Sequence, residues 1–233
     1  MNTKKPNLLL LHGALASKEQ MTPLSNLLQS EIEVHAFSFT GHGGLPIPDA
    51  GFTMDDFVQD IFQYMEKRNL QTASLFGYSM GGYAALLASL STPWQFEKVI
   101  TLGVKLDWTP ESAALEMQQL NTDKMQEKIP AFVKHLEKIH APNEWIQVVE
   151  ATKEMMKHLG EKPDLTEGIQ WHDMAALMLY GSDDKTAGTD ASLAIARQHP
   201  YGEVVQLPGV GHPFEKMKME ALAKLLKIVL LKS

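Results

Sequence analysis

The chain has 233 residues, of which 44% are hydrophobic and 21% are charged, and its formal net charge is −7. These proportions are typical of a soluble globular protein. Cysteine is absent, which excludes disulfides, thiolate metal sites and a catalytic thiol, so any nucleophile must be an oxygen or a nitrogen atom. The 28 acidic residues outnumber the 21 basic ones and are spread along the chain, which argues against a nucleic-acid partner.

The N-terminal segment resembles a secretion signal only superficially. Its uninterrupted apolar run is Leu8 to Leu11, which is shorter than the roughly 7–15 residues that such a signal needs. No stretch reaches the ~18–20 apolar residues of a membrane span, because Lys224 and Lys227 interrupt the apolar C-terminal stretch. We therefore expect a cytoplasmic protein without a membrane partner.

Short apolar runs alternate with longer segments of helical periodicity, which is typical of an α/β fold: a mostly parallel sheet with helices on both faces. We expect about six strands. The predicted strands are 7–11, 33–39, 73–76, 98–102, 175–180 and 203–207. The predicted helices of this core are 17–30, 54–69, 79–91, 187–199 and 213–231, with Thr53 as the N-cap of the second. A loop rich in glycine and proline is predicted at 41–48.

Between residues 103 and 172, helical periodicity continues without a convincing strand. We interpret this segment as a helical lid inserted into one α/β core made of 1–102 and 173–233. The insertion holds three of the four tryptophans and several methionines, side chains that suit an apolar substrate pocket. The alternative is that they pack the small core of the insertion itself. The residues that we expect to line the pocket are Leu15, Trp108, Trp145, Met155 and Trp171.

The sequence Gly77-Tyr78-Ser79-Met80-Gly81 stands between a predicted strand and a helix rich in alanine and leucine. A serine on such a tight turn needs neighbours without side chains two positions away on either side, and Gly77 and Gly81 meet that need. The helix aims unpaired N–H groups and a partial positive charge at the same point. The pattern predicts Ser79 as a nucleophile, and the alternative is that Ser79 merely caps the helix.

A serine hydroxyl needs a base in order to attack at neutral pH. His212 lies in a glycine-rich loop after the last predicted strand, where an imidazole can reach a turn on a neighbouring strand. His12 also follows a predicted strand, and we interpret it as a scaffold residue whose ring holds its loop by a hydrogen bond. The histidines of the insertion are expected at its surface: His135, His140, His158 and His172.

The acid that orients the base should follow a strand and lie between the serine and the histidine in chain order. Asp183 and Asp184 both meet these conditions, and their chemistry alone does not separate them. We favour Asp184, and Asp107 is a weaker substitute because it follows another predicted strand.

The loop after the first predicted strand is expected to pass close to the serine, because Gly13 allows the backbone a tight turn. The backbone N–H groups of Ala14 and Met80 are then the predicted donors to a developing oxyanion. This chemistry needs neither a metal ion nor an organic cofactor. We expect a small-molecule substrate as the partner, and the oligomeric state stays open.

Together these motifs resemble the α/β-hydrolase superfamily. The resemblance rests on short motifs after successive strands: His12-Gly13, Gly41-His42-Gly43, Gly77 to Gly81, Gly181-x-x-Asp184 and Gly211-His212. It implies that Ser79, Asp184 and His212 form a triad, that Ala14 and Met80 are the oxyanion donors, and that 103–172 takes the place of the family's lid. It also favours Asp184 over Asp183, since the family's acid usually falls three residues after the strand-end glycine.

Two departures from the family pattern bear on function. Ser38-Phe39-Thr40 stands where many relatives have Asp-x-Pro, and Tyr83 stands where the menaquinone-pathway lyase, usually called a synthase, often has arginine. The chain looks more like the small bacterial carboxylesterases. We therefore expect a serine hydrolase that cleaves a carboxylic ester or thioester of a small, partly apolar substrate through an acyl-enzyme. The alternatives are a triad-dependent C–C hydrolase or lyase, and a ligand-binding protein that has lost turnover.

Overall fold

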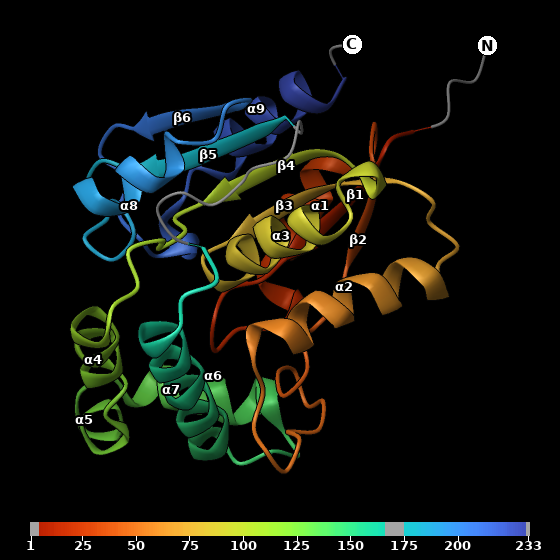
Figure 1. Cartoon of the computed structure of the whole chain (residues 1–233). Coiled ribbons are helices and arrows are strands. Elements are labelled where there is room, and N and C mark those ends of the chain that lie inside the picture. Colours follow the sequence, from red (N-terminus) through yellow and green to blue (C-terminus); the bar gives the residue numbers. More distant parts are fainter. Residues whose placement is uncertain (1–4, 166–174, 232–233) are drawn as a thin grey trace.

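The computed structural model describes residues 5–165 and 175–231, and within these ranges it contains a six-stranded sheet (Figure 1). All neighbouring strands run parallel, in the order β2-β1-β3-β4-β5-β6. This confirms the predicted α/β fold with its mostly parallel sheet. The strands are β1 (Asn7–Leu11), β2 (Glu33–Ala36), β3 (Ala73–Tyr78), β4 (Phe96–Leu102), β5 (Ala176–Gly181) and β6 (Gly202–Leu207).

Helices cover both faces of the sheet (Figure 1). One face packs against α2 (Met54–Lys67), α3 (Met80–Ser91) and α8 (Asp190–Ala196), and the other against α1 (Thr22–Leu28) and α9 (Met219–Leu231). Successive side chains of β1 alternate between the two layers, because a strand points neighbouring residues to opposite faces. Both layers are apolar, which is why β1 contains four consecutive leucines.

Most boundaries of the core elements lie near the predicted ones, and the differences have local causes. Strand β2 ends at Ala36 rather than at residue 39, and at the predicted end of the strand the N–H groups bond to side chains instead of to a neighbouring strand. The N–H of Phe39 donates to His12 Nε2 at 3.0 Å, and that of Thr40 donates to the carboxylate of Asp60 at 2.7 Å. Helix α2 begins as predicted, with Thr53 as its N-cap in a capping box with Asp56.

Three other predicted helices are shorter or divided. The segment 17–30 forms a 3₁₀ turn (Lys18–Met21) followed by α1, which has a proline in its first turn. The C-terminal segment likewise forms a 3₁₀ turn (Phe214–Lys216) before α9. Helix α8 covers only part of 187–199 because its N-cap is Thr189, whose side chain accepts the N–H of Ser192 at 3.1 Å. A further 3₁₀ turn (Pro93–Gln95) precedes β4.

Between β4 and β5 the chain leaves the sheet and forms the helical insertion, as predicted. Its helices are α4 (Pro110–Gln119), α5 (Thr122–Lys128), α6 (Pro130–His140) and α7 (Trp145–Glu161), and they lie together beyond one end of the sheet (Figure 1). Helix α7 packs against α4 and α6. The predicted C-terminal part of the insertion, including Trp171 and His172, lies outside the described residues.

The insertion has a hydrophobic cluster of its own. Trp145, Leu136, Val148 and Val149 are buried in it, together with Leu15 from the loop after β1. The core therefore contributes the buried Leu15 to the interior of the insertion, and the partly buried Ile47 packs against the same cluster, so the two parts are joined.

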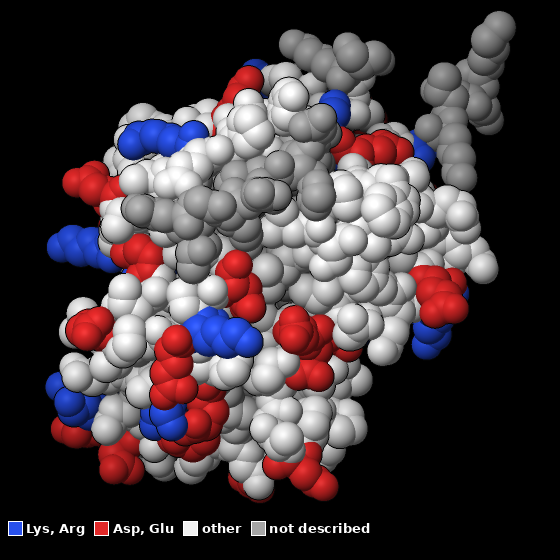
Figure 2. All heavy atoms as spheres, in the orientation of Figure 1, with Lys and Arg blue, Asp and Glu red and all other residues white. Residues whose placement is uncertain are grey.

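The surface carries charges of both signs. On the face that Figure 2 shows, Lys and Arg side chains are interspersed with Asp and Glu side chains and do not gather into one patch. Within the described ranges, no helix is long and apolar enough to cross a membrane.

Candidate active site

Ser79 occupies the tight turn between β3 and α3. Its φ of 50° and ψ of −117° are strained for a residue with a side chain. A Cβ atom at Gly77 would collide with the backbone of Gly81, and one at Gly81 would lie 2.5 Å from the carbonyl oxygen of His12. The turn therefore requires both glycines, as the sequence predicts. Ser79 occupies the N-cap position of α3, but its side chain makes no capping hydrogen bond, so the alternative that this side chain caps the helix is wrong.

Three side chains from loops after different strands converge at this turn. Ser79 Oγ lies 3.2 Å from His212 Nε2, and His212 Nδ1 lies 2.8 Å from Asp184 Oδ2. The loops follow β3, β6 and β5, and parallel strands bring their carboxyl ends to one edge of the sheet. Because the Asp184 carboxylate accepts a hydrogen from Nδ1, the neutral ring presents Nε2 to the serine as an acceptor.

The carboxylate of Asp184 is buried and well held. Its Oδ1 accepts the N–H groups of Thr186 and Ala187, each at 2.9 Å. Burial alone would raise the pKa of Asp184, but its hydrogen bonds to His212, Ala187 and Thr186 outweigh burial and hold that pKa below its ordinary value. The group is therefore ionised beside the imidazole.

The two other candidate acids lie elsewhere. Asp183 is exposed, and its Oδ1 accepts the hydroxyl of Ser182 at 3.0 Å. Asp107 lies 3.1 Å from the ammonium of Lys105 and accepts the hydroxyl of Thr189 at 2.8 Å. Neither carboxylate is bonded to His212, so the structure pairs this ring with Asp184.

Two neighbours of the triad were not anticipated from the sequence. Gly103 has a φ of 64°, and a Cβ atom there would lie 3.1 Å from Asp184 Oδ2 and 3.4 Å from His212 Nδ1. Tyr78 donates its hydroxyl to the carbonyl oxygen of His212 at 2.9 Å. The contacts of both residues are with parts of the chain far away in sequence, and no local pattern reveals such contacts.

The predicted oxyanion donors lie beside the serine. The side chains of Ala14, Met80 and Ser79 line one cavity. Met80 is the first residue of α3, so its N–H has no partner within the helix. The N–H of Gly13 is used by Gln20 Oε1 at 3.0 Å, whereas that of Ala14 has no acceptor among the described residues.

Buried histidines hold the loop that carries Ala14. His12 accepts the N–H of Phe39 at Nε2, so its Nδ1 carries the hydrogen and donates to the carbonyl oxygen of Gly13 at 2.8 Å. Because the C=O and N–H of a trans peptide point in opposite directions, this bond turns the Ala14 N–H away from the ring. The prediction that His12 is a scaffold residue is confirmed.

The prediction that His140 lies at the surface is wrong, because this side chain at the end of α6 is completely buried. It accepts the N–H of Gly43 at Nδ1, 3.1 Å away, and its Nε2 lies 3.2 Å from the carbonyl oxygen of Leu15. The sequence shows a histidine on a polar helix, and it does not show that this helix end meets the loop after β1. His135 and His158 are exposed, as predicted.

Three of the buried histidines, His12, His42 and His140, form a neutral cluster. The rings of His12 and His42 are 5.3 Å apart, and those of His42 and His140 are 5.8 Å apart. Burial lowers the pKa of His12 to about 4, although its hydrogen bond to Gly13 opposes this change. Burial also lowers the pKa of His42 and of His140. Neutral rings have one donor and one acceptor nitrogen, as the bonds of His12 and His140 require.

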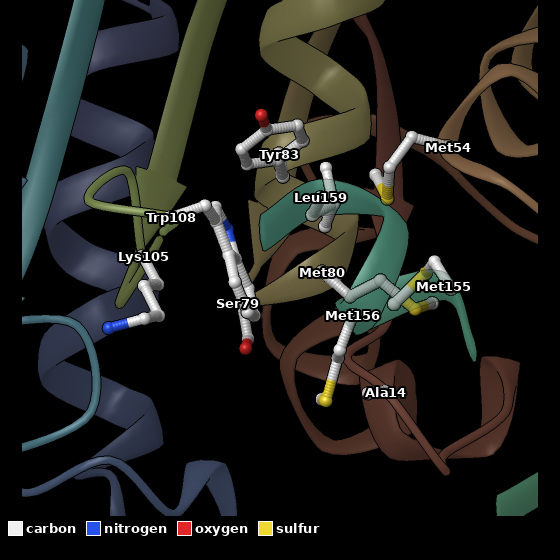
Figure 3. A pocket seen from close by; sticks show the side chains of 10 residues that line it. All are labelled: Ala14, Met54, Ser79, Met80, Tyr83, Lys105, Trp108, Met155, Met156 and Leu159. Carbon is white, nitrogen blue, oxygen red and sulfur yellow. The ribbon is translucent and has the colours of Figure 1, made fainter. Parts of the chain in front are cut away.

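Two hollows of very different size meet at the site. The first, which we call the inner cavity, has a volume of about 40 Å³. Its lining is Ala14, Met54, Ser79, Met80, Tyr83, Lys105, Trp108, Met155, Met156 and Leu159 (Figure 3). The second, which we call the outer groove, has a volume of about 960 Å³ and is lined by His212, Tyr78, Leu15 and residues of α6 and α9. Ala14 borders both.

The residues predicted to line the substrate pocket have different positions. Trp108 and Met155 border the inner cavity, and Leu15 borders the outer groove. Trp145 is buried in the hydrophobic cluster of the insertion instead. Trp171 lies outside the described residues. In those residues, no group of three or more His, Asp or Glu side chains could hold a metal ion.

A parallel sheet with a serine on this turn is the architecture of an α/β hydrolase. A model of the alpha/beta hydrolase family matches residues 8–225, and the chain belongs to this family.

Known relatives of the chain include ester-cleaving enzymes. The sn-1-specific diacylglycerol lipase ABHD11 of Xenopus tropicalis is 24% identical over 89% of this chain and 72% of its own length. Carboxylesterase YbfK of Bacillus subtilis is 30% identical over 42% of this chain and 33% of its own length. In three curated relatives, including that carboxylesterase, the match spans only 28–37% of the relative's length.

The fold is also similar to that of solved structures. The enol-lactonase from Burkholderia xenovorans LB400 has a TM-score of 0.78 at 17% identity, over 99% of this chain and 93% of that one. This likeness covers the insertion as well as the sheet, and it concerns the fold alone.

Proposed function

We propose that the protein is a serine esterase that cleaves a carboxylic ester, or a thioester, through an acyl-enzyme. The observation that carries this proposal is the unbroken hydrogen-bond chain from the buried Asp184 through His212 to Ser79. Ester cleavage by the relatives whose names denote a lipase and a carboxylesterase supports it.

In the first half of the reaction, His212 Nε2 takes the proton of Ser79 while Oγ attacks the acyl carbon of the ester. The carbonyl oxygen becomes an oxyanion, which accepts hydrogens from the amides of Ala14 and Met80. When this intermediate collapses, the C–O bond to the alcohol breaks, and the alcohol leaves with the proton that His212 held.

The second half releases the acid. His212 removes a proton from water as the water oxygen attacks the acyl-enzyme, and the same two amides hold the new oxyanion. Collapse breaks the bond to Ser79 Oγ, which regains its proton from His212. Throughout the cycle, Asp184 stays ionised and stabilises the imidazolium that forms twice.

The test uses the purified chain with p-nitrophenyl butyrate and a fluorophosphonate probe. We expect rapid turnover and stoichiometric labelling at Ser79, and the Ser79→Ala variant should lose labelling and about 10³–10⁶-fold of the turnover. Turnover that survives in Ser79→Ala would falsify the proposal. Labelling of Ser79 without hydrolysis of any ester would point to a C–C hydrolase, a lyase or a binding protein instead.

A further inference from the structure

We infer that the substrate has a short acyl group, which occupies the inner cavity, and a bulky, uncharged, largely apolar leaving group, which lies in the outer groove. This inference rests on the proposed esterase function and assigns each side of the ester to one hollow.

The assignment follows from the direction in which the proton must travel. The leaving oxygen takes its proton from His212 Nε2, so the alcohol must lie on the side of that ring. His212 borders the outer groove and is absent from the lining of the inner cavity, whereas Ser79 and Met80 border the inner cavity. An acyl carbon bonded to Ser79, with its oxygen at the Met80 amide, therefore has its alkyl substituent in the inner cavity.

The sizes of the two hollows set the sizes of the two groups. Pockets that enclose drug-sized ligands measure about 300–1,000 Å³, and the outer groove, at about 960 Å³, falls at the top of this range. The inner cavity, at about 40 Å³, holds only a few heavy atoms. Its far wall is formed by Met155, Met156 and Leu159 of α7, which face Trp108 and Ser79 across the cavity (Figure 3). A long acyl chain would have to displace these side chains.

The charges at the two hollows favour a neutral substrate. The lining of the outer groove includes the carboxylates of Glu19 and Glu215 but, in the described part of the chain, neither lysine nor arginine. A leaving group with phosphates, such as coenzyme A, would be repelled there. Lys105, the one cation among the described residues that line the inner cavity, lies 3.1 Å from Asp107 and 3.9 Å from Glu116, so its charge is already matched.

The outer groove also offers apolar surface to the leaving group. Phe132 on α6 is 40% exposed, and it borders the groove together with the partly buried Ile139 and Met219. An extended alkyl or aryl alcohol would cover these side chains on binding and gain roughly 25 cal/mol for each Å² of apolar surface buried.

The sharpest test compares two isomers, octyl acetate and ethyl octanoate, which have the same atoms and similar leaving-group chemistry. We expect kcat/KM for octyl acetate to exceed that for ethyl octanoate by at least about tenfold, because a single methylene that does not fit its pocket can lower kcat/KM by that factor. Equal or reversed values, in a preparation whose Ser79 is labelled and which hydrolyses p-nitrophenyl acetate, overturn the inference and leave the proposed function intact. If no ester is hydrolysed, the proposed function itself fails.

A second test uses variants of the α7 side chains that form the far wall of the inner cavity. Met156→Ala and Met155→Ala should raise the kcat/KM ratio of ethyl octanoate to octyl acetate by about tenfold, because each deepens the inner cavity. Met156 is only partly buried, so its variant should fold even if Met155→Ala does not. The matched control is Met65→Ala, which removes a buried methionine that borders neither hollow and should leave the ratio unchanged. An unchanged ratio in a folded Met156→Ala contradicts the assignment of the acyl group.

The charge of the leaving group is tested with two acetyl thioesters, acetyl-coenzyme A and the neutral S-acetyl-N-acetylcysteamine. We expect kcat/KM for the neutral thioester to be at least about tenfold higher at low ionic strength, with a smaller difference at high salt. Glu215→Gln should also reduce the difference in kcat/KM between the two thioesters. If acetyl-coenzyme A is the better substrate, the leaving group is not uncharged and that part of the inference is wrong.

Discussion

The α/β core and the helical insertion contribute different things to one site. The core supplies Ser79, Asp184 and His212 from loops at the carboxyl edge of the sheet, where the hydrogen-bonded ladder fixes their positions. The insertion supplies an apolar wall from α7 and one side of the outer groove from α6. The reacting geometry therefore depends on the strands, whereas the shape offered to a substrate depends on how the helices pack beside them.

The two regions meet at the loop after β1. The side chain of Leu15 packs inside the insertion, while its carbonyl oxygen lies 3.2 Å from His140 Nε2. The preceding residue is Ala14, one of the two proposed oxyanion donors. The insertion can therefore influence the reaction through this loop as well as through the shape of the cavity.

The largest effect in this comparison should come from the acid of the core. Asp184→Asn removes the charge that stabilises the imidazolium and favours the wrong tautomer of His212, so we expect kcat to fall by about 10³–10⁴-fold. Steady-state kinetics on p-nitrophenyl butyrate measure this loss. The control is Asp183→Asn, which alters an exposed neighbour and should keep full activity. A larger loss in Asp183→Asn than in Asp184→Asn would reverse the assignment of the acid.

Lowering the pH should destabilise the folded protein at the junction between the two regions, where His12 and His140 are buried. The pKa of His12 is about 4 in the folded chain against an ordinary value of 6.5, and the pKa values of His42 and His140 are also lowered. Below pH 6.5 the unfolded chain binds more protons than the folded one, so the free energy of unfolding decreases as the pH falls from about 6.5 to 4. Apart from the rings of this cluster, Glu19 is a charged group that affects His12, and it raises the pKa of His12.

For His12 alone, the loss should be on the order of 3 kcal/mol by pH 4. Urea unfolding at a series of pH values measures it. In His12→Asn, the free energy of unfolding at pH 7 should be lower than in the unaltered protein. Between pH 6.5 and 4, however, this variant should take up about one proton fewer on unfolding, so its free energy of unfolding should depend less on pH. The same pH dependence in both proteins would show that His12 does not titrate in this window.

The core was more predictable from the sequence than the insertion. The leucine run of β1 and the glycines at 77 and 81 stand out in the local sequence, so their pattern predicts both the strand and the turn, although the atoms that Gly81 must avoid belong to Leu11 and His12. Trp108 and Trp145 look alike in the sequence, yet one borders the inner cavity and the other is buried in the insertion. Trp108 lies in the loop before α4, and Trp145 is the first residue of α7. Whether such a side chain turns toward the sheet or into the insertion depends on tertiary packing, which the sequence pattern does not record.

His140 tests whether the insertion positions the oxyanion loop. His140→Ala removes both its contact with Leu15 and the acceptor for the Gly43 N–H, so we expect kcat on p-nitrophenyl acetate to fall about 10–100-fold, less than the loss of a direct oxyanion donor. KM should change little, since His140 borders neither hollow. His140→Gln keeps a donor and an acceptor and should recover part of kcat.

The control for His140 is His158→Ala, which removes an exposed histidine of α7 and should be neutral. Thermal unfolding of each variant separates loss of fold from loss of positioning. A His140→Ala enzyme that stays folded and keeps its kcat would show that the insertion affects only the shape of the site.

The smallest effect should come from Tyr78, which acts within the core alone. Tyr78→Phe removes the hydrogen bond to the His212 carbonyl oxygen but keeps the ring, whose centroid lies 5.4 Å from that of His212 and 5.0 Å from that of Phe214. One such bond contributes about 0.5–1.5 kcal/mol, so kcat should fall roughly 2–10-fold. The rate of fluorophosphonate labelling at Ser79 should fall by the same factor, because the base is displaced in both reactions. A lower melting temperature with an unchanged labelling rate would assign Tyr78 to stability and not to the position of His212.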